Sequence, residues 1–159
     1  MGRSADHGQS FGGLATQSEE AALERPQGSA AVLWSQRSEV LMVRHLRRDG
    51  STYWQLPGGG VVSGERPEDA VIRELKEETG LDGKVVRELF TLPYRDGASS
   101  TFQVEASDVM EPRLGSDPEE ADAGHTKLVE VGWKLLDDTR GNPICVCKYA
   151  LHRMLGEAY

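Results

Sequence analysis

Positive charge, cysteine and long apolar stretches are all scarce in this sequence. Its 159 residues carry 18 Lys and Arg against 26 Asp and Glu, which gives a formal net charge of −8 at pH 7. Broad, sequence-independent binding to nucleic acid needs a basic face that displaces counterions from phosphates, so the charge argues against such binding. A compact nucleotide that brings its own metal ions is still compatible with an acidic chain.

The sequence also lacks an apolar run near the roughly 20 residues that a membrane-spanning helix requires. Its first residues contain no long hydrophobic stretch of the kind that forms a secretion signal, and Asp6 stands where a myristoylation signal needs Ser or Thr. We therefore expect no membrane association and a cytoplasmic location. The only two cysteines, Cys145 and Cys147, have no partner ligands of a zinc site near them, and we interpret them as buried free thiols.

The composition indicates one domain preceded by a tail. A chain of 17.4 kDa with 38% hydrophobic residues suits one globular core. Residues 1–27 are rich in Gly, Ser, Gln, Ala and Glu and show no sustained apolar periodicity, which predicts a flexible N-terminal tail. We expect the folded domain to comprise residues 28–159, and we leave open whether it forms a homodimer.

Short apolar or alternating segments predict a series of strands, and the first two are separated by a polar tetrapeptide that suits a hairpin. The expected strands are Ala30–Trp34, Glu39–His45, Tyr53–Leu56, Lys84–Leu92, Thr101–Ala106 and Lys127–Trp133. Phe102, Val104 and Ala106 should share one face, as should Val129, Val131 and Trp133.

Two helices are expected between and after these strands. Pro67 suits the first position of a helix and Gly80 suits the cap at its far end, so we predict a helix over Pro67–Thr79. Asn142-Pro143 begins a closing helix with an apolar stripe. Pro57–Gly60 and Asp108–Gly124 are expected to be loops. Strands interleaved with helices predict an α/β (α+β) domain with a mixed sheet between helices.

The helix over Pro67–Thr79 carries an acidic face that its local environment does not favour. Successive residues turn by about 100°, so Glu74, Glu77 and Glu78 lie within one arc. The carboxylates repel one another, and two of them stand in the last turn, where the helix dipole favours cations; together these effects cost roughly 1–2 kcal/mol. Such local conflicts mark functional sites in otherwise consistent sequences.

Helix geometry alone leaves two explanations for this acidic face. Clustered carboxylates are the ligands that Mg²⁺ or Mn²⁺ prefers, and Mg²⁺ shares its remaining positions between water and substrate phosphates. The alternative is a solvated acidic face, with Val71, Ile72 and Leu75 packed on the core and Arg73 paired with Glu77.

The residues around the helix decide between these explanations, because they resemble the Nudix box, G-x5-E-x7-R-E-U-x-E-E-x-G-U, where U is aliphatic. A chance match is expected on the order of once in 10⁹ starting points. Every fixed and aliphatic position of the box is present, at Gly59, Glu65, Arg73, Glu74, Leu75, Glu77, Glu78, Gly80 and Leu81.

The resemblance implies a Nudix-like α/β/α sandwich and a Mg²⁺-dependent hydrolase, with Mn²⁺ as a second metal to consider. Glu74, Glu77 and Glu78 would be metal ligands, and one of them would serve as the base. The Gly59 carbonyl would also reach the metal. By the same resemblance, Arg73 would orient the glutamates, and Glu65 would either brace the loop or bind a metal through water. In some family members a later glutamate supplies the base, and Glu119 and Glu120 are candidates here.

The remainder of the substrate site is less determined. Trp54 could stack on a base and Arg44 could reach outer phosphates, against the alternatives of a core aromatic residue and an exposed surface charge. For His45 and His125 we expect structural roles.

The implied reaction is hydrolysis of a nucleoside diphosphate linked to another group. The default substrate is a nucleoside triphosphate, oxidised or not, which yields a monophosphate and pyrophosphate. The alternatives are an ADP-ribose or dinucleoside polyphosphate hydrolase, and a nucleotide-sensing module without turnover.

Overall fold

The computed structural model describes residues 26–34, 39–94, 97–106, 111–116 and 126–135. Several predictions fall outside this part of the chain and stay predictions: the N-terminal tail, the closing helix after Asn142, the two cysteines, His125, and Glu119 with Glu120.

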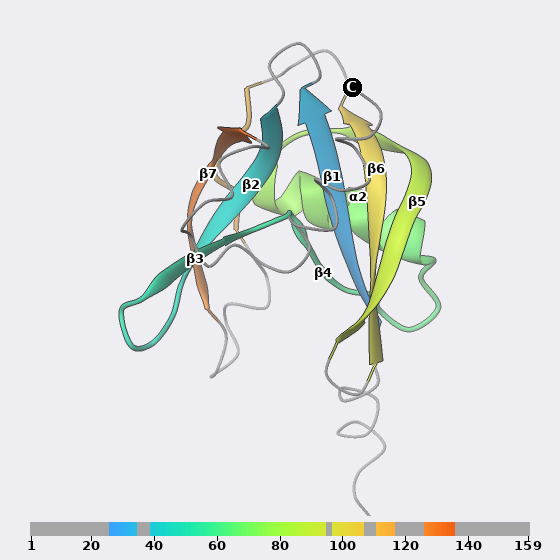
Figure 1. Ribbon diagram of the computed structural model, residues 1–159, viewed down its shortest axis with the longest axis horizontal. Coiled ribbons are helices and arrows are strands. Elements are labelled where there is room, and N and C mark those ends of the chain that lie inside the picture. The colour runs from blue at the N-terminus through green and yellow to red at the C-terminus, as the bar shows by residue number, and fades with distance from the viewer. Residues whose placement is uncertain (1–25, 35–38, 95–96, 107–110, 117–125, 136–159) are drawn as a thin grey trace, which may run out of the picture.

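The described residues form a mixed sheet system and one helix, as the sequence predicts (Figure 1). The strands are β1 (Gln27–Trp34), β2 (Glu39–Leu46), β3 (Thr52–Gln55), β4 (Gly58–Gly60), β5 (Gly83–Tyr94), β6 (Gly97–Ala106) and β7 (Lys127–Leu135), and the helix is α2 (Pro67–Thr79). β1 begins at the last residue of the predicted tail.

β1 is the strand that joins the two parts of the sheet. It pairs in parallel with β6, from Gln27 opposite Ser99 to Val32 opposite Val104, and β6 pairs antiparallel with β5. Its far end meets β2 through Leu33 opposite Val40, which confirms the predicted hairpin. Its first residues also pair with β4, so the expectation that Gly58–Gly60 is only loop is wrong. The reason is tertiary: these glycines pair with Gln27–Ser29 along the edge of β1 that β6 does not occupy.

β2 carries the second part of the sheet, with β7 along one edge and β3 beside its last four residues. The register with β7 shifts between Arg44 and His45, and a bulge of this kind reverses which side chains face the core. Val131 and Trp133 pack against the core as predicted, whereas beyond the shift Leu128, rather than Val129, lies opposite His45. Val129 is thus the extra residue at the register shift, and its predicted face stays a prediction.

The helix α2 has the predicted bounds because its end signals are local. Arg66 is extended, Pro67 opens the first turn, and Gly80 takes the left-handed conformation, φ 72°, while its N–H donates to the Lys76 carbonyl. Val71 and Leu75 are fully buried among core residues of β2 and β6, so one face of the helix is fixed on the sheet. Figure 1 shows α2 lying across the sheet behind β1 and β6.

Replacing Leu75 by alanine should lower the free energy of unfolding by roughly 2–5 kcal/mol, because the fully buried side chain would leave a cavity between helix and sheet. Chemical denaturation measures this change. Val86→Ala is the matched control, since Val86 lies on β5 and is 47% exposed; a comparable loss in both variants would contradict the described core.

Candidate active site

Two of the three clustered glutamates on α2 are buried. Glu78 is 1% exposed and Glu74 is 4% exposed, whereas Glu77 is partly open to solvent. Charged side chains seldom lose their water unless they are paired or bind a metal. A solvated acidic face therefore describes Glu77 at most, and Glu74 and Glu78 need partners from the surrounding fold.

Arg73 is the centre of the cluster. Its Nε and Nη2 donate to the two carboxylate oxygens of Glu65, at 2.8 and 3.0 Å, in the two-pronged geometry that a guanidinium favours. Its Nη1 lies 2.8 Å from Glu74 Oε1 and 3.3 Å from Glu77 Oε2, and its Nη2 also donates to the Gly60 carbonyl. One side chain thus ties the loop before the helix to the acidic face of the helix.

The charges in this cluster stabilise one another. The hydrogen bond from Arg73 lowers the pKa of Glu65 below its ordinary value, against the opposing effect of burial. In turn, hydrogen bonds first to Glu65 and then to Glu74 raise the pKa of Arg73 above its already high ordinary value. Glu65 is therefore an ionised brace whose carboxylate also accepts from the Val62 N–H, at 3.1 Å.

Gly59 lies directly against Glu74. A Cβ at this position would stand 2.7 Å from the Glu74 carboxyl carbon, closer than real side chains approach one another. Only glycine therefore leaves the Glu74 carboxylate its place beside the loop. Next to it, the Gly58 N–H donates to Glu78 Oε2 at 2.9 Å. The structure thus brings the glycine loop and both buried glutamates together, as the sequence predicts.

Beyond Glu78, the site continues into β2 and β3. Glu78 Oε1 lies 4.0 Å from Nε2 of His45, which is itself 3% exposed. The position of His45 beside the box glutamates was not predicted from the sequence. A signal was available: His45 is in phase with Leu41 and Val43, so it had to face the same side of the sheet as these core residues.

A second feature missed in the sequence is a strap over the end of α2, residues 111–116. The backbone N–H groups of Arg113, Gly115 and Ser116 donate to the carbonyls of Thr79, Glu78 and Glu77, at 2.8, 2.9 and 3.2 Å. Carbonyls in the last turn of a helix have no partner within the helix. The strap therefore fixes the turn that carries two of the box glutamates, although the sequence predicted only a surface loop there.

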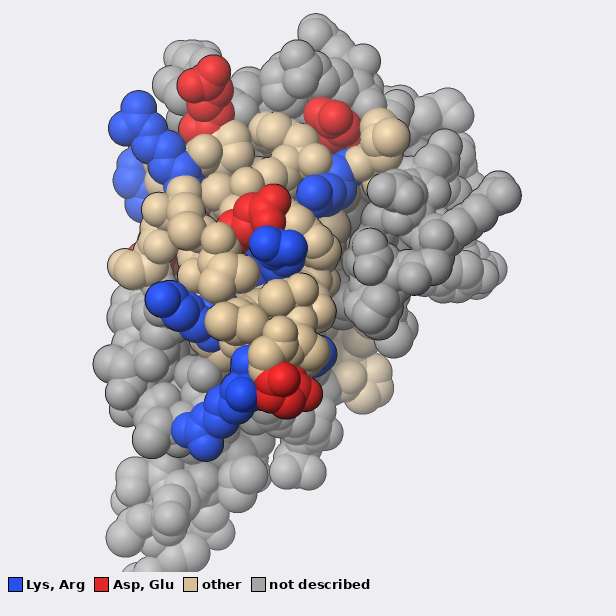
Figure 2. Space-filling view, turned by 90° about the vertical axis from the view of Figure 1, so that its left-hand side faces the viewer, with Lys and Arg blue, Asp and Glu red and all other residues tan. Residues whose placement is uncertain are grey.

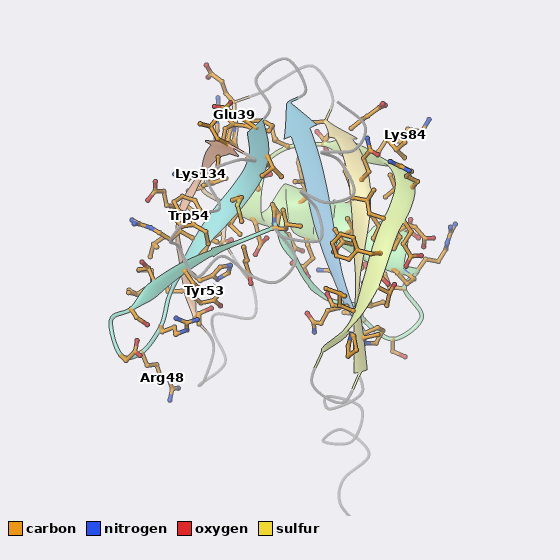
Figure 3. All side chains as sticks on the ribbon, viewed as in Figure 1. Glu39, Arg48, Tyr53, Trp54, Lys84 and Lys134 are labelled. Carbon is orange, nitrogen blue, oxygen red and sulfur yellow. The ribbon has the colours of Figure 1, made fainter. Side chains whose placement is uncertain are left out.

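Trp54 and Arg44 lie apart from this cluster. They stand opposite each other on β3 and β2, and strand alternation places both on the face away from His45 and Gln55. Lys134 Nζ lies 4.0 Å from the centroid of the Trp54 indole, and Figure 3 shows the two side chains next to each other. Arg44 forms an ion pair with Glu130 at 2.7 Å. The structure does not bring these two candidates to the box glutamates.

On the side of the molecule that carries β2, β3 and β7, basic and acidic side chains are interspersed (Figure 2). Arg44 and Glu130 form one such pair of opposite charges on this side. The described residues on this side therefore present no continuous field of one sign.

Comparisons with known proteins agree with this arrangement. The family model described as the NUDIX domain matches residues 24–143, more than half of the chain, and the chain belongs to this family. Within the described residues, no helix is long and apolar enough to cross a membrane.

Curated relatives match the chain over short segments. An RNA pyrophosphohydrolase from Marinomonas sp. (strain MWYL1) is 49% identical over 51 residues, which cover 32% of this chain and 30% of that protein. An RNA pyrophosphohydrolase from Actinobacillus succinogenes is 44% identical over 59 residues, which cover 37% of this chain and 28% of that protein. The matches thus span less than a third of either relative.

Solved structures match over most of the chain. The MutT Nudix hydrolase of Burkholderia pseudomallei superposes with a TM-score of 0.62 at 23% identity, covering 83% of this chain and 98% of that one. An ADP-ribose pyrophosphatase from Streptococcus suis 89-1591 gives 0.61 at 23% identity, covering 84% and 91%. At this identity the likeness establishes the fold, and it confirms the expected mixed α+β architecture.

Nudix hydrolases generally use divalent metal ions, and the donor set here is of the right kind. Carboxylate oxygens from Glu74, Glu77 and Glu78 are hard ligands, and one cationic nitrogen, Arg73 Nη1, already joins the first two. Among the described residues no three acidic, histidine or cysteine side chains converge closely enough to hold an ion as they stand. The carboxylates of Glu74 and Glu77 are directed at Arg73, and that of Glu78 at Gly58.

Replacing Arg73 by lysine should lower the free energy of unfolding by roughly 1–2 kcal/mol, because lysine keeps the charge but cannot serve Glu65 and Glu74 at once. Urea denaturation measures this. The control is Lys76→Arg on the same helix, whose exposed pair with Asp82 should contribute less than about 0.5 kcal/mol. Equal stability of Arg73→Lys and the wild type would contradict the conclusion that Arg73 holds Glu65 and Glu74 together.

Replacing Gly115 by alanine should push the strap off the helix, because the new Cβ would lie 1.7 Å from the Glu77 carbonyl oxygen. We expect a loss of roughly 1–3 kcal/mol in unfolding free energy and faster hydrogen exchange of the Arg113 amide. Gly132→Ala is the matched control, since a Cβ there meets nothing within 4 Å. If the two variants exchange alike, the strap does not hold the helix end.

Proposed function

We propose that this chain is a metal-dependent pyrophosphohydrolase that cleaves a nucleoside diphosphate linked to another group. The observation that carries the proposal is the burial of Glu74 and Glu78 beside the glycine loop, with Glu77 on the same helix face and partly exposed. Burying a carboxylate costs free energy. One arginine, Arg73, would be neutralised by a single carboxylate, so its presence does not explain three glutamates on this face. The family and the unbroken box support the same conclusion.

The resemblance to the Nudix box supports a role for each box residue. Glu74, Glu77 and Glu78 would hold Mg²⁺, or Mn²⁺, with the Gly59 carbonyl as a further ligand. When bound, such an ion neutralises charge that develops on a diphosphate and orients the attacking water. Glu77 is the most exposed of the three glutamates, so we assign to it the contact with incoming water, including removal of its proton.

The neighbours of these ligands set their positions. Arg73, held on Glu65, orients Glu74 and Glu77, and the Gly58 N–H orients Glu78. None of these contacts requires the substrate. These donors therefore hold the three carboxylates on one side of the helix before any ligand arrives, and binding of an ion would require the carboxylates to turn from Arg73 and Gly58 toward the ion.

The substrate we propose first is a nucleoside triphosphate, oxidised or not, cleaved to a monophosphate and pyrophosphate. A second candidate is the triphosphorylated 5′ end of an RNA, because relatives that match 50 to 59 residues of this chain at 44–50% identity are named RNA pyrophosphohydrolases. ADP-ribose and dinucleoside polyphosphates are further candidates, the former supported by the name of a structural neighbour. A nucleotide-sensing module without turnover is the alternative from another class.

The test is a hydrolysis screen with product identification. The purified chain is incubated with Mg²⁺ or Mn²⁺ and a panel of nucleoside triphosphates, their oxidised forms, ADP-ribose, dinucleoside polyphosphates and 5′-triphosphorylated RNA. Glu77→Gln and Glu78→Gln should each reduce turnover by about 100-fold or more, because each removes a charge needed by the reaction. Glu68→Gln, in the first turn of the same helix, should leave turnover within about twofold.

The outcomes separate the alternatives. Equal turnover by the wild type and both box variants would remove the proposed site. Tight nucleotide binding with no product from any member of the panel would favour the sensing module. The position of cleavage identifies the leaving group and therefore selects among the substrate candidates.

A further inference from the structure

His45 is a buried residue of β2 that lies next to Glu78 of the box. Its ring stacks on Tyr53, with centroids 5.4 Å apart and planes inclined by 17°, and the side chain is 3% exposed. Nδ1 lies 3.1 Å from the Thr126 hydroxyl, and Nε2 lies 2.9 Å from the amide nitrogen of Gln55. The stacking on Tyr53 thus fixes the plane of the ring, and the contacts with Gln55 and Thr126 fix its rotation within that plane.

The edge of this fixed ring faces Glu78. Nε2 lies 4.0 Å from Glu78 Oε1, while Glu78 Oε2 accepts from the Gly58 N–H at 2.9 Å. The carboxylate therefore stands between a backbone donor of the glycine loop on one side and the imidazole edge on the other. Because the glutamate is 1% exposed, water does not compete for this place.

The ring is held through both of its nitrogens. Gln55 lies within hydrogen-bond distance of Nε2 and Thr126 within hydrogen-bond distance of Nδ1, whichever nitrogen carries the proton. These contacts and the stacking on Tyr53 keep the same edge of the ring toward Glu78. Mutation of a group that orients a metal ligand typically lowers metal affinity or activity by about 10- to 100-fold.

We infer that His45, held by Gln55, Thr126 and Tyr53, is a positioning residue that fixes the Glu78 carboxylate toward the glycine loop. The inference rests on the proposed function in that Glu78 is taken as a metal ligand. It goes beyond the box, because His45 lies on β2 and outside the box motif. No contact of His45 with substrate is implied, so its effect should appear in metal binding and kcat rather than in KM.

Two amide substitutions separate a positioning role from a merely structural one. In His45→Gln the amide reaches the place of Nε2 and faces Glu78 and Gln55. In His45→Asn the amide reaches only the place of Nδ1, beside Thr126, and the space next to Glu78 is left unfilled. Both variants remove the ring and both leave an uncharged amide. They differ in where that amide lies, next to Glu78 in His45→Gln and next to Thr126 in His45→Asn.

Three measurements are made on the full chain: the dissociation constant of Mn²⁺ by electron paramagnetic resonance, kcat and KM for the substrate found in the screen, and hydrogen exchange of the Gly58 amide by NMR. His45→Asn should weaken Mn²⁺ binding by about 10-fold or more and lower kcat. Its KM should stay within about twofold, and Gly58 should exchange about 10-fold faster. His45→Gln should restore each value to within about threefold of the wild type.

Thr101→Val is the control for disturbance of the buried sheet. Thr101 is 1% exposed on β6, and its hydroxyl has no hydrogen-bond partner among the described residues, so the variant should match the wild type in all three measurements.

Equal behaviour of His45→Asn and His45→Gln, whether both are impaired or both are normal, would overturn the inference. Failure of the proposed function gives a different pattern. If the wild type hydrolyses nothing, Mn²⁺ binding and Gly58 exchange still decide the role of His45. If the wild type also binds no Mn²⁺, Gly58 exchange alone decides it, because that amide reports where Glu78 lies without any metal.

Discussion

The arrangement of this molecule depends on keeping two carboxylates buried on the helix that also builds the core. Val71 and Leu75 anchor α2 on the sheet, and the same packing draws Glu74 and Glu78 out of water. An unpartnered buried charge would be strongly destabilising, so the surroundings have to supply donors. Arg73 and the Gly58 N–H supply two of them, one from the helix and one from the glycine loop. The need to supply hydrogen-bond donors to these buried carboxylates therefore links the position of the glycine loop to that of the helix.

Local signals made part of this fold predictable. The bounds of α2 follow from Pro67 and Gly80, because each acts through the backbone conformation of its own neighbourhood. The strands were found wherever apolar residues alternate, as in Phe102 and Val104. Features that depend on distant partners were missed. The pairing of β4 with β1, the bulge opposite His45 and the strap at Gly115 all arise from contacts between segments far apart in the sequence.

The same division applies to the candidate site. Spacing alone indicates which residues share the acidic face and pairs Arg73 with Glu77, since neighbours on a helix are set by its period. The wider role of Arg73 among the glutamates is implied by the resemblance to the Nudix box. Spacing did not indicate that Glu78 would be buried more deeply than Glu77, because burial depends on what covers each side chain. Nor could it place Trp54, whose face is decided by the register of β3 against β2. A one-residue shift of that register would have turned Trp54 toward the box and Tyr53 away from it.

Charge balance constrains how any phosphate could enter this site. Three carboxylates, those of Glu65, Glu74 and Glu77, contact the guanidinium of Arg73, and Glu78 is buried on the same helix. Among the described residues these carboxylates outnumber the cation that they share, and the buried ones are poorly screened by salt. A diphosphate brings further negative charge, so its approach to these residues is unfavourable unless positive charge arrives with it. A divalent cation would relieve both the repulsion among the glutamates and the repulsion of the phosphates, which is the physical basis for expecting a metal ion at three clustered glutamates.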